Sequence, residues 1–153
     1  MTDRRSLAGS PDLAVKLLLQ KIEQAAKAGV DRIQIREKDL SGRELAQLAE
    51  QAILRAGRGS SVLVNDRLDV AYAAGAAGVH LGENSLPPSE ARKLVSRNGA
   101  RTNFQVGVSA HSLEGAMQAE QAGAEYVIFG PVYTTPSKAS FGEPQGVQRL
   151  KEI

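Results

Sequence analysis

Hydrophobic and polar residues follow two alternating periods along the chain. Residues 11–28 place apolar side chains at helical spacing, with Ser10 as N-cap and Pro11 at the first helical position. Residues 30–36 instead alternate polar and apolar positions, which is the period of a strand. The two patterns recur in turn, and they predict helices over residues 11–28, 41–57, 68–74, 87–95, 112–122 and 146–153, and strands over residues 30–36, 61–64, 77–81, 104–108 and 125–129.

Strict alternation of helices with short apolar strands is typical of right-handed βαβ units and a parallel sheet. The strands recur every 20 to 30 residues or so, the pace of a (β/α)₈ barrel of roughly 250 residues. An open doubly wound sheet is the alternative, and the lack of GxGxxG or Walker spacing weakens it without eliminating it. We therefore expect an α/β fold, an incomplete (β/α)₈ TIM barrel with about five of its eight parallel strands.

Polar residues gather where the predicted strands end. In chain order, the strands are followed by Gln34, Arg36 and Lys38; by Asn65 and Asp66; by His80, Gly82, Glu83 and Ser85; by Ser109 and His111; and by Thr134, Thr135, Ser137 and Lys138. Ligands of parallel α/β folds bind at the carboxyl ends of the strands, where helix amino termini also favour anions. Three cations beside one carboxylate suit a diphosphate with a divalent metal.

Each of these groups also fits a structural role. The basic residues after the first strand fit a solvated sheet edge, and Asn65 with Asp66 fits a cap of the next helix. His80 lies between apolar residues, which favours a hydrogen-bonded core histidine over a catalytic base, and His111 fits helix capping as well as chemistry. Only their joint placement at one rim favours a site.

Composition narrows the class of protein. The 153 residues are 42% hydrophobic and 24% charged, with no cysteine and a net charge of +2. The sequence therefore excludes disulfides and cysteine metal sites, and no apolar run approaches the roughly 20 residues of a membrane helix. Dispersed charge and few aromatic residues argue against nucleic acid. We expect a cytoplasmic protein with neither a membrane nor a nucleic-acid partner.

Five segments, in order and at matching spacing, resemble the thiamine phosphate synthase/TenI family over essentially the whole chain. They are QIREK at 34–38, VNDRLD at 64–69, GVHLG at 78–82, GVSAHS at 107–112 and GPVYTTPSK at 130–138. The synthase of this family is a transferase that joins hydroxymethylpyrimidine diphosphate to a thiazole phosphate and releases diphosphate. The resemblance thus implies small phosphorylated heterocycles as partners, and it leaves a homo-oligomer open.

The resemblance also implies roles for individual residues. It implies pyrimidine diphosphate ligands at Gln34, Arg36, Lys38, Asn65, Ser109 and Lys138, a thiazole phosphate border at Thr135, Pro136 and Ser137, and a Mg²⁺ ligand at Asp66. Fixed cations and a metal in a dry site neutralise the departing diphosphate, so Arg36, Lys38 and Lys138 are catalytic candidates. No covalent nucleophile is needed.

One departure from the family pattern concerns the metal. Ser85 stands where the synthases place a second metal-binding Asp, and Glu83 is a conjectural substitute. TenI-type proteins isomerise the thiazole without the metal pair, and a histidine at the position of His111 is thought to move the proton. The retained basic residues and Asp66 favour the synthase. A thiazole tautomerase and a catalytically silent phosphate-binding module remain as alternatives.

The other departures concern the two ends of the sequence. By comparison with the family, residues 1–153 form a single partial barrel domain that lacks the first strand and the last two strands. We therefore expect a fragment of a longer protein or an incomplete gene model, with little or no synthase activity on its own.

Overall fold

Helices and strands alternate along the whole chain in the computed structural model, which describes residues 1–97, 103–134 and 143–153. The helices are η1 (Arg4–Ser6), α1 (Pro11–Lys27), α2 (Gly42–Ala56), α3 (Leu68–Ala73), α4 (Pro88–Arg97), α5 (Leu113–Gln121) and α6 (Gly146–Leu150). The strands are β1 (Arg32–Ile35), β2 (Ser61–Asn65), β3 (Gly78–Leu81), β4 (Gln105–Ala110) and β5 (Tyr126–Phe129). Every helix and strand expected from the periodicity is confirmed, with ends that differ by up to three residues, and the short helix η1 is an addition.

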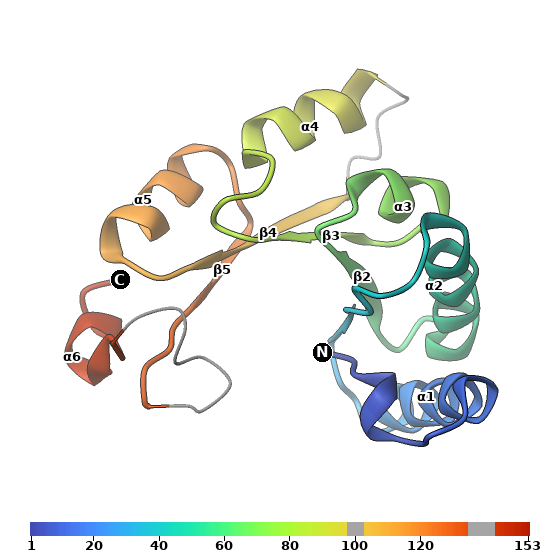
Figure 1. Cartoon of the computed structure of the whole chain (residues 1–153). Coiled ribbons are helices and arrows are strands. Elements are labelled where there is room, and N and C mark those ends of the chain that lie inside the picture. The colour runs from blue at the N-terminus through green and yellow to red at the C-terminus, as the bar shows by residue number, and fades with distance from the viewer. Residues whose placement is uncertain (98–102, 135–142) are drawn as a thin grey trace. The chain divides into compact units, whose positions relative to one another are not determined.

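The strands form one sheet in the order β1-β2-β3-β4-β5 (Figure 1). The pairings of β1 with β2 and of β4 with β5 are both parallel. Sequential order is that of neighbouring strands in a (β/α)₈ barrel, whereas a doubly wound sheet reverses its order at a switch point. The α/β fold class is confirmed, and the doubly wound alternative is wrong.

The chain divides into two compact units, Met1–Val79 and His80–Ile153, with the boundary inside β3. In the first unit, α1 and α2 lie side by side (Figure 1). Their buried leucines, Leu18 and Leu48 among them, form a core with the interior residues of β1 and β2. Each fully buried leucine or isoleucine side chain contributes about 1.5–3 kcal/mol. This apolar packing fixes β1 and β2, the two strands whose carboxyl ends carry the first two groups of predicted site residues.

A capping box fixes the start of α2, directly after the polar segment that follows β1. The Ser41 hydroxyl accepts from the Glu44 N–H at 3.3 Å, and the Glu44 carboxylate accepts from the Ser41 N–H at 2.9 Å. Serine followed three residues later by glutamate is the sequence signature of such a box, which satisfies two backbone donors that the first helical turn leaves unpaired. The loop between β1 and α2 is thereby anchored at its far end.

In the second unit, β4 and β5 pair with Gly107 opposite Tyr126. A Cβ atom at Gly107 would lie 2.0 Å from Cζ of Tyr126, so the tyrosine ring crosses β4 where only glycine leaves room. Val106 and Val108 beside this glycine are buried. Across the described ranges, no helix combines the length and the apolar character that a membrane crossing requires.

Candidate active site

The carboxyl ends of β1 and β2 bring Gln34 and Asn65 together. Parallel pairing sets Ile35 against Val64, so the side chains near these strand ends lie at one edge of the sheet. Gln34 Nε2 donates to Asn65 Oδ1 at 3.0 Å, and both side chains are half-buried. Two of the predicted diphosphate ligands therefore contact each other directly.

A cavity of about 260 Å³ lies at this end of the first unit. Its lining includes three predicted site residues, Lys38, Asn65 and Asp66, and is completed by Glu37, Leu40, Leu45 and Arg67. Arg36 is half-buried and Lys38 is exposed. A hollow with a cation, a carboxylate and an amide on its wall has the chemistry to hold a phosphorylated ligand.

Asp66 has a left-handed backbone conformation, with a φ of 64°. Aspartate tolerates this region better than most residues, although not as well as glycine. The N-cap residue of α3 is Arg67, whose side chain makes no capping hydrogen bond. Asn65 and Asp66 precede this position, so the interpretation of either residue as the N-cap of the following helix is wrong.

The cavity wall carries two carboxylates, Asp66 and Glu37, and Glu37 is already paired with Arg4. Among the described residues, no group of three or more His, Cys, Asp or Glu side chains could hold a metal ion. Magnesium is commonly held by one or two carboxylates together with substrate phosphates and water. The donor set around Asp66 thus fits a magnesium ion shared with a bound diphosphate, and not a metal held by the protein alone.

His80 is buried in the second unit, with a hydrogen bond at each ring nitrogen. Its Nε2 lies 2.8 Å from the Ser109 hydroxyl and its Nδ1 lies 3.1 Å from the Tyr126 hydroxyl. The ring also stacks on Tyr126, with centroids 5.6 Å apart. Burial lowers the pKa of His80, which favours the neutral imidazole. The interpretation as a hydrogen-bonded core histidine is confirmed, and it places His80 directly behind the predicted ligand Ser109.

His111 contacts the carbonyl oxygen of Gly130 through Nδ1. A carbonyl only accepts, so Nδ1 carries the hydrogen, and in the neutral ring Nε2 is the proton acceptor. The cap of α5 is Ser112, whose hydroxyl accepts from the Gly115 N–H at 3.0 Å. The capping alternative for His111 is therefore wrong, and its predicted chemical role stays a prediction.

Ser85 and Glu83 both serve local structure in the second unit. The Ser85 hydroxyl accepts from the Gly82 N–H at 3.1 Å. The Glu83 carboxylate lies 3.4 Å from the His111 N–H and against Gly115, at the amino end of α5, where the helix dipole favours negative charge. A metal-binding role for Glu83 stays a conjecture.

The remaining candidates follow β5 in the sequence. Thr134 is exposed. Thr135, Pro136, Ser137 and Lys138 lie outside the described residues, so their expected roles at the thiazole phosphate and the diphosphate stay predictions.

Sequence reasoning missed Arg4. This arginine is buried in η1, and its guanidinium contacts both Glu37 and Asp39, the acidic residues that flank Lys38. Arg4 is 33 positions from Glu37 and 35 positions from Asp39, and no periodic pattern links residues so far apart. The one available signal was the alternation of two acidic and two basic residues at 36–39, after the first strand.

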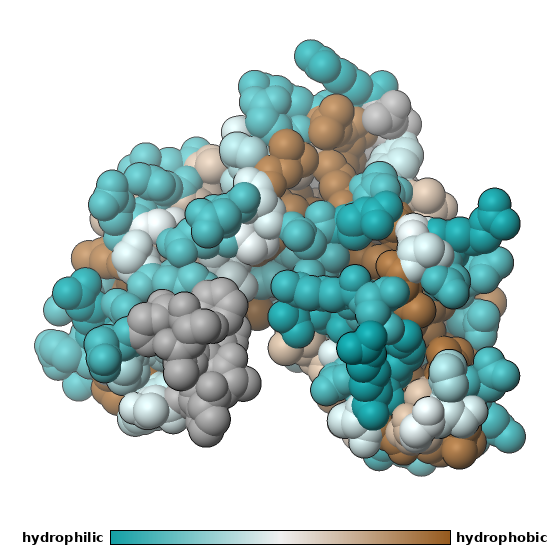
Figure 2. Space-filling view, in the orientation of Figure 1, coloured by the Kyte–Doolittle hydropathy of each residue, from teal (hydrophilic) through white to brown (hydrophobic). Residues whose placement is uncertain are grey.

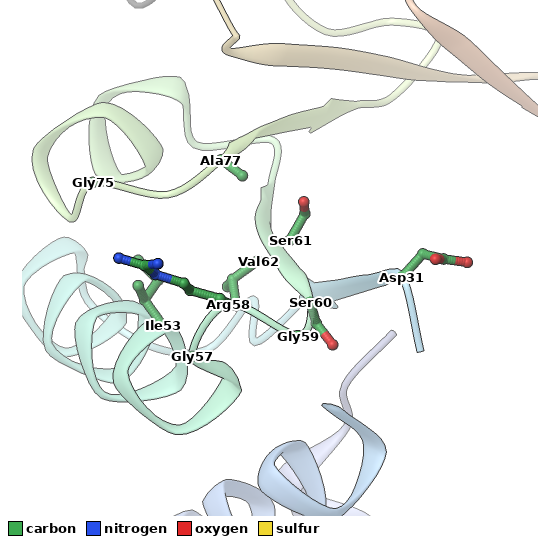
Figure 3. Close-up of a pocket in the computed structure, with 10 residues that line it drawn as sticks. All are labelled: Asp31, Ile53, Gly57, Arg58, Gly59, Ser60, Ser61, Val62, Gly75 and Ala77. Atoms are coloured by element: carbon green, nitrogen blue, oxygen red, sulfur yellow. The ribbon is translucent and has the colours of Figure 1, made fainter. Parts of the chain in front are cut away.

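A second cavity lies away from these residues, at the amino ends of β1 and β2. It measures about 420 Å³ and is lined by the turn that follows α2, with Asp31, Arg58 and Ser61 among its residues (Figure 3). The side chains of Arg58 and Asp31 point away from each other there (Figure 3). Charged groups do not converge, and the amino end of a parallel barrel is the end that carries stability rather than ligands.

Comparison with known proteins decides the family. The sequence model of the thiamine monophosphate synthase family matches residues 9–153, nearly the whole chain. The chain belongs to this family. The thiamine-phosphate synthase of Clostridium novyi is 36% identical over 100% of this chain and 70% of that protein. That of Methanoculleus marisnigri is 45% identical over 84% of this chain and 59% of that protein.

A solved structure of a thiamine phosphate pyrophosphorylase from Pyrococcus furiosus is similar to this member of the thiamine monophosphate synthase family. The TM-score is 0.74 at 29% identity, over 88% of this chain and 61% of that chain. A relative from Geobacter sulfurreducens is 44% identical over 98% of this chain, and the match covers 66% of that relative. The chain thus spans about two thirds of the length of its relatives.

Proposed function

We propose that this chain is, or forms part of, a transferase of thiamine biosynthesis. It couples hydroxymethylpyrimidine diphosphate to thiazole phosphate and releases diphosphate. The observation that carries the proposal is the cavity that Lys38, Asn65 and Asp66 line at the carboxyl ends of the strands, in a chain that belongs to the thiamine monophosphate synthase family. The expected location is the cytoplasm, in keeping with the cysteine-free sequence.

In this reaction the bond between the pyrimidine methylene and the diphosphate breaks, and the thiazole nitrogen captures the resulting cation. The protein has to stabilise charge that grows on the leaving oxygen, which fixed cations do at little reorganisation cost. Arg36 and Lys38 supply that charge from the first unit, with Lys138 as the predicted third cation. A magnesium ion held by Asp66 would add positive charge at the diphosphate oxygens.

The hydrogen bond between Gln34 and Asn65 fixes the orientation of the side-chain amide of Asn65. Because Oδ1 of Asn65 accepts from Gln34 Nε2, its two N–H donors point to the opposite side of the amide group. Asn65 also lines the cavity. We expect these donors to bind a phosphate oxygen, with Gln34 acting as the support that keeps the amide from rotating.

Diphosphate release by the intact protein tests the proposal. With both substrates and Mg²⁺ we expect turnover, and chelation should abolish it. Asp66→Asn should lower kcat by about 100-fold or more, because an amide replaces the carboxylate that holds a hard cation. Lys38→Met should lower it by about 10-fold or more. Asp12→Asn is the matched control, since Asp12 is exposed on α1 and does not line the cavity. Binding of the pyrimidine diphosphate without any release would instead support the silent binding module.

A thiazole tautomerase is the second candidate. One observation favours it: the contact of His111 with Gly130 leaves Nε2 as the basic atom of the neutral ring. The family resemblance adds that Ser85 stands where the synthases place a second metal ligand. Isomerisation of thiazole phosphate that persists in chelator and is lost in His111→Asn would establish this candidate over the synthase.

A further inference from the structure

Arg4 joins two carboxylates of the segment that follows β1. Its Nη1 donates to Glu37 at 2.9 Å and to Asp39 at 2.8 Å, and its Nη2 donates to Asp39 at 2.5 Å. The backbone N–H of Arg4 donates to the other carboxylate oxygen of Glu37 at 3.0 Å. The side chains of Arg4 and Glu37 are only 9% and 2% exposed, so the pair is shielded from solvent.

The charges of this segment explain why such pairing matters. Residues 36–39 read Arg, Glu, Lys, Asp, so two cations alternate with two carboxylates and the segment has no net charge. Glu37 and Asp39 would repel a diphosphate near Lys38 and offset its attraction to the two cations, unless those carboxylates were neutralised. Arg4 binds both, and its hydrogen bond holds the pKa of Asp39 well below its ordinary value.

The chain just before Arg4 also holds the backbone of this segment. The Thr2 N–H donates to the Gln34 carbonyl at 2.9 Å, and the Thr2 hydroxyl accepts from the Arg36 N–H at 2.9 Å. Hydrophilic residues gather where β1 leads into α2 (Figure 2). Two residues of the N-terminal segment therefore fix the position and the charge of a segment more than 30 residues away.

We propose that Arg4 is a positioning residue for diphosphate recognition. It holds residues 36–39 in place and pairs Glu37 and Asp39, so that Arg36 and Lys38 present their charge to the anion. This inference rests on the proposed function, because it assigns the anion to the same cavity. Arg4 itself acts through its neighbours, without touching the ligand.

Titration of inorganic diphosphate into the intact protein, with Mg²⁺ present, tests the inference by calorimetry. Arg4→Met should weaken binding by about 10-fold or more, because it removes the guanidinium from both carboxylates beside Lys38 and leaves Glu37 with a backbone N–H and Asp39 with the exposed Arg5. Arg5→Met is the matched control: Arg5 also contacts Asp39, at 3.0 Å, but its side chain is 71% exposed. We expect that change to alter affinity by less than about 2-fold.

Two further variants separate positioning from mere stability. Arg4→Lys keeps the charge without the two-pronged contact, and it should raise KM for the pyrimidine diphosphate with KM for thiazole phosphate unchanged. Arg4→Met combined with Glu37→Gln and Asp39→Asn should recover most of the diphosphate affinity, because the repelling charges leave with the arginine.

The outcomes also separate this inference from the function on which it rests. Wild-type affinity in Arg4→Met, or in Arg4→Lys should the methionine variant fail to fold, would overturn the role of Arg4 and leave the proposed function standing. Absence of diphosphate binding by the wild-type protein would overturn both.

Discussion

His80 occupies a site that disfavours the charged imidazole. Burial lowers its pKa from the ordinary value of 6.5, and its two nitrogens contact the hydroxyl groups of Ser109 and Tyr126. The unfolded chain takes up a proton near pH 6.5, whereas the folded chain resists it to lower pH. The stability that this site contributes is therefore complete above pH 6.5 and is lost as the pH falls from 6.5 towards the lowered pKa.

We predict that the free energy of unfolding decreases between pH 7 and pH 5, by at most about 1.4 kcal/mol per pH unit for this single group. Urea unfolding at several pH values measures it. In His80→Asn the slope over this range should flatten, since most carboxylates titrate below it. An unchanged slope in the variant would show that another group is responsible.

At this scale the sequence was informative about residue types and weak about partners. His80 was interpretable as a buried histidine because apolar residues flank it in a strand pattern. The ion pair of Arg4 with Glu37 could not be predicted, because a contact between residues 33 positions apart leaves no local pattern in the sequence. The roles of Ser109 and Lys38 as phosphate ligands came from the family resemblance. A ligand-binding measurement is the test of both roles.

Among the elements, β4 and β5 depend on one close approach. A methyl group at Gly107 would lie 2.0 Å from a ring carbon of Tyr126, and a stacked His80 limits where that ring can move. We predict that Gly107→Ala destabilises the protein by about 1–3 kcal/mol through overpacking. Chemical denaturation would measure the change.

The control for that prediction is Gly9→Ala, because nothing lies within 4 Å of a Cβ placed at Gly9. We expect it to change stability by less than about 0.5 kcal/mol. In a Tyr126→Ala background, Gly107→Ala should cost much less, since the clash is gone; additive costs would exclude the steric explanation.

Element boundaries were the less predictable part of the fold, for reasons of hydrogen bonding. The apolar pattern placed the first strand from residue 30, yet β1 begins at Arg32. The Val30 N–H donates to the Ala25 carbonyl at 3.1 Å, so this residue completes the end of α1 instead of joining the sheet. The start of α2 was predictable to the residue, because Ser41 and Glu44 form a local capping signal.

For the whole molecule, burial differs between the middle of the sheet and its last strand. Every residue of β3 is buried, whereas β5 is partly exposed and Ile128 is 52% exposed. In the described sheet, β1 and β5 each have one neighbouring strand. Strand edges of this kind pair with other chains unless they are covered.

We therefore predict that the 153-residue chain, produced alone, associates or melts without cooperativity, and has little synthase activity. Circular dichroism with size-exclusion chromatography would measure this. A compact monomer with a sharp melt, or normal turnover by the short chain, would contradict the prediction of a partial barrel.

The backbone of Asp66 sets two selective pressures against each other. Its φ of 64° is one that glycine adopts without strain, so a chain optimised for folding stability alone would gain up to about 1 kcal/mol from glycine there. Such a change would delete the carboxylate from the wall of the cavity. Engineering that selects variants for folding stability alone would therefore tend to replace Asp66, the side chain on which turnover is expected to depend.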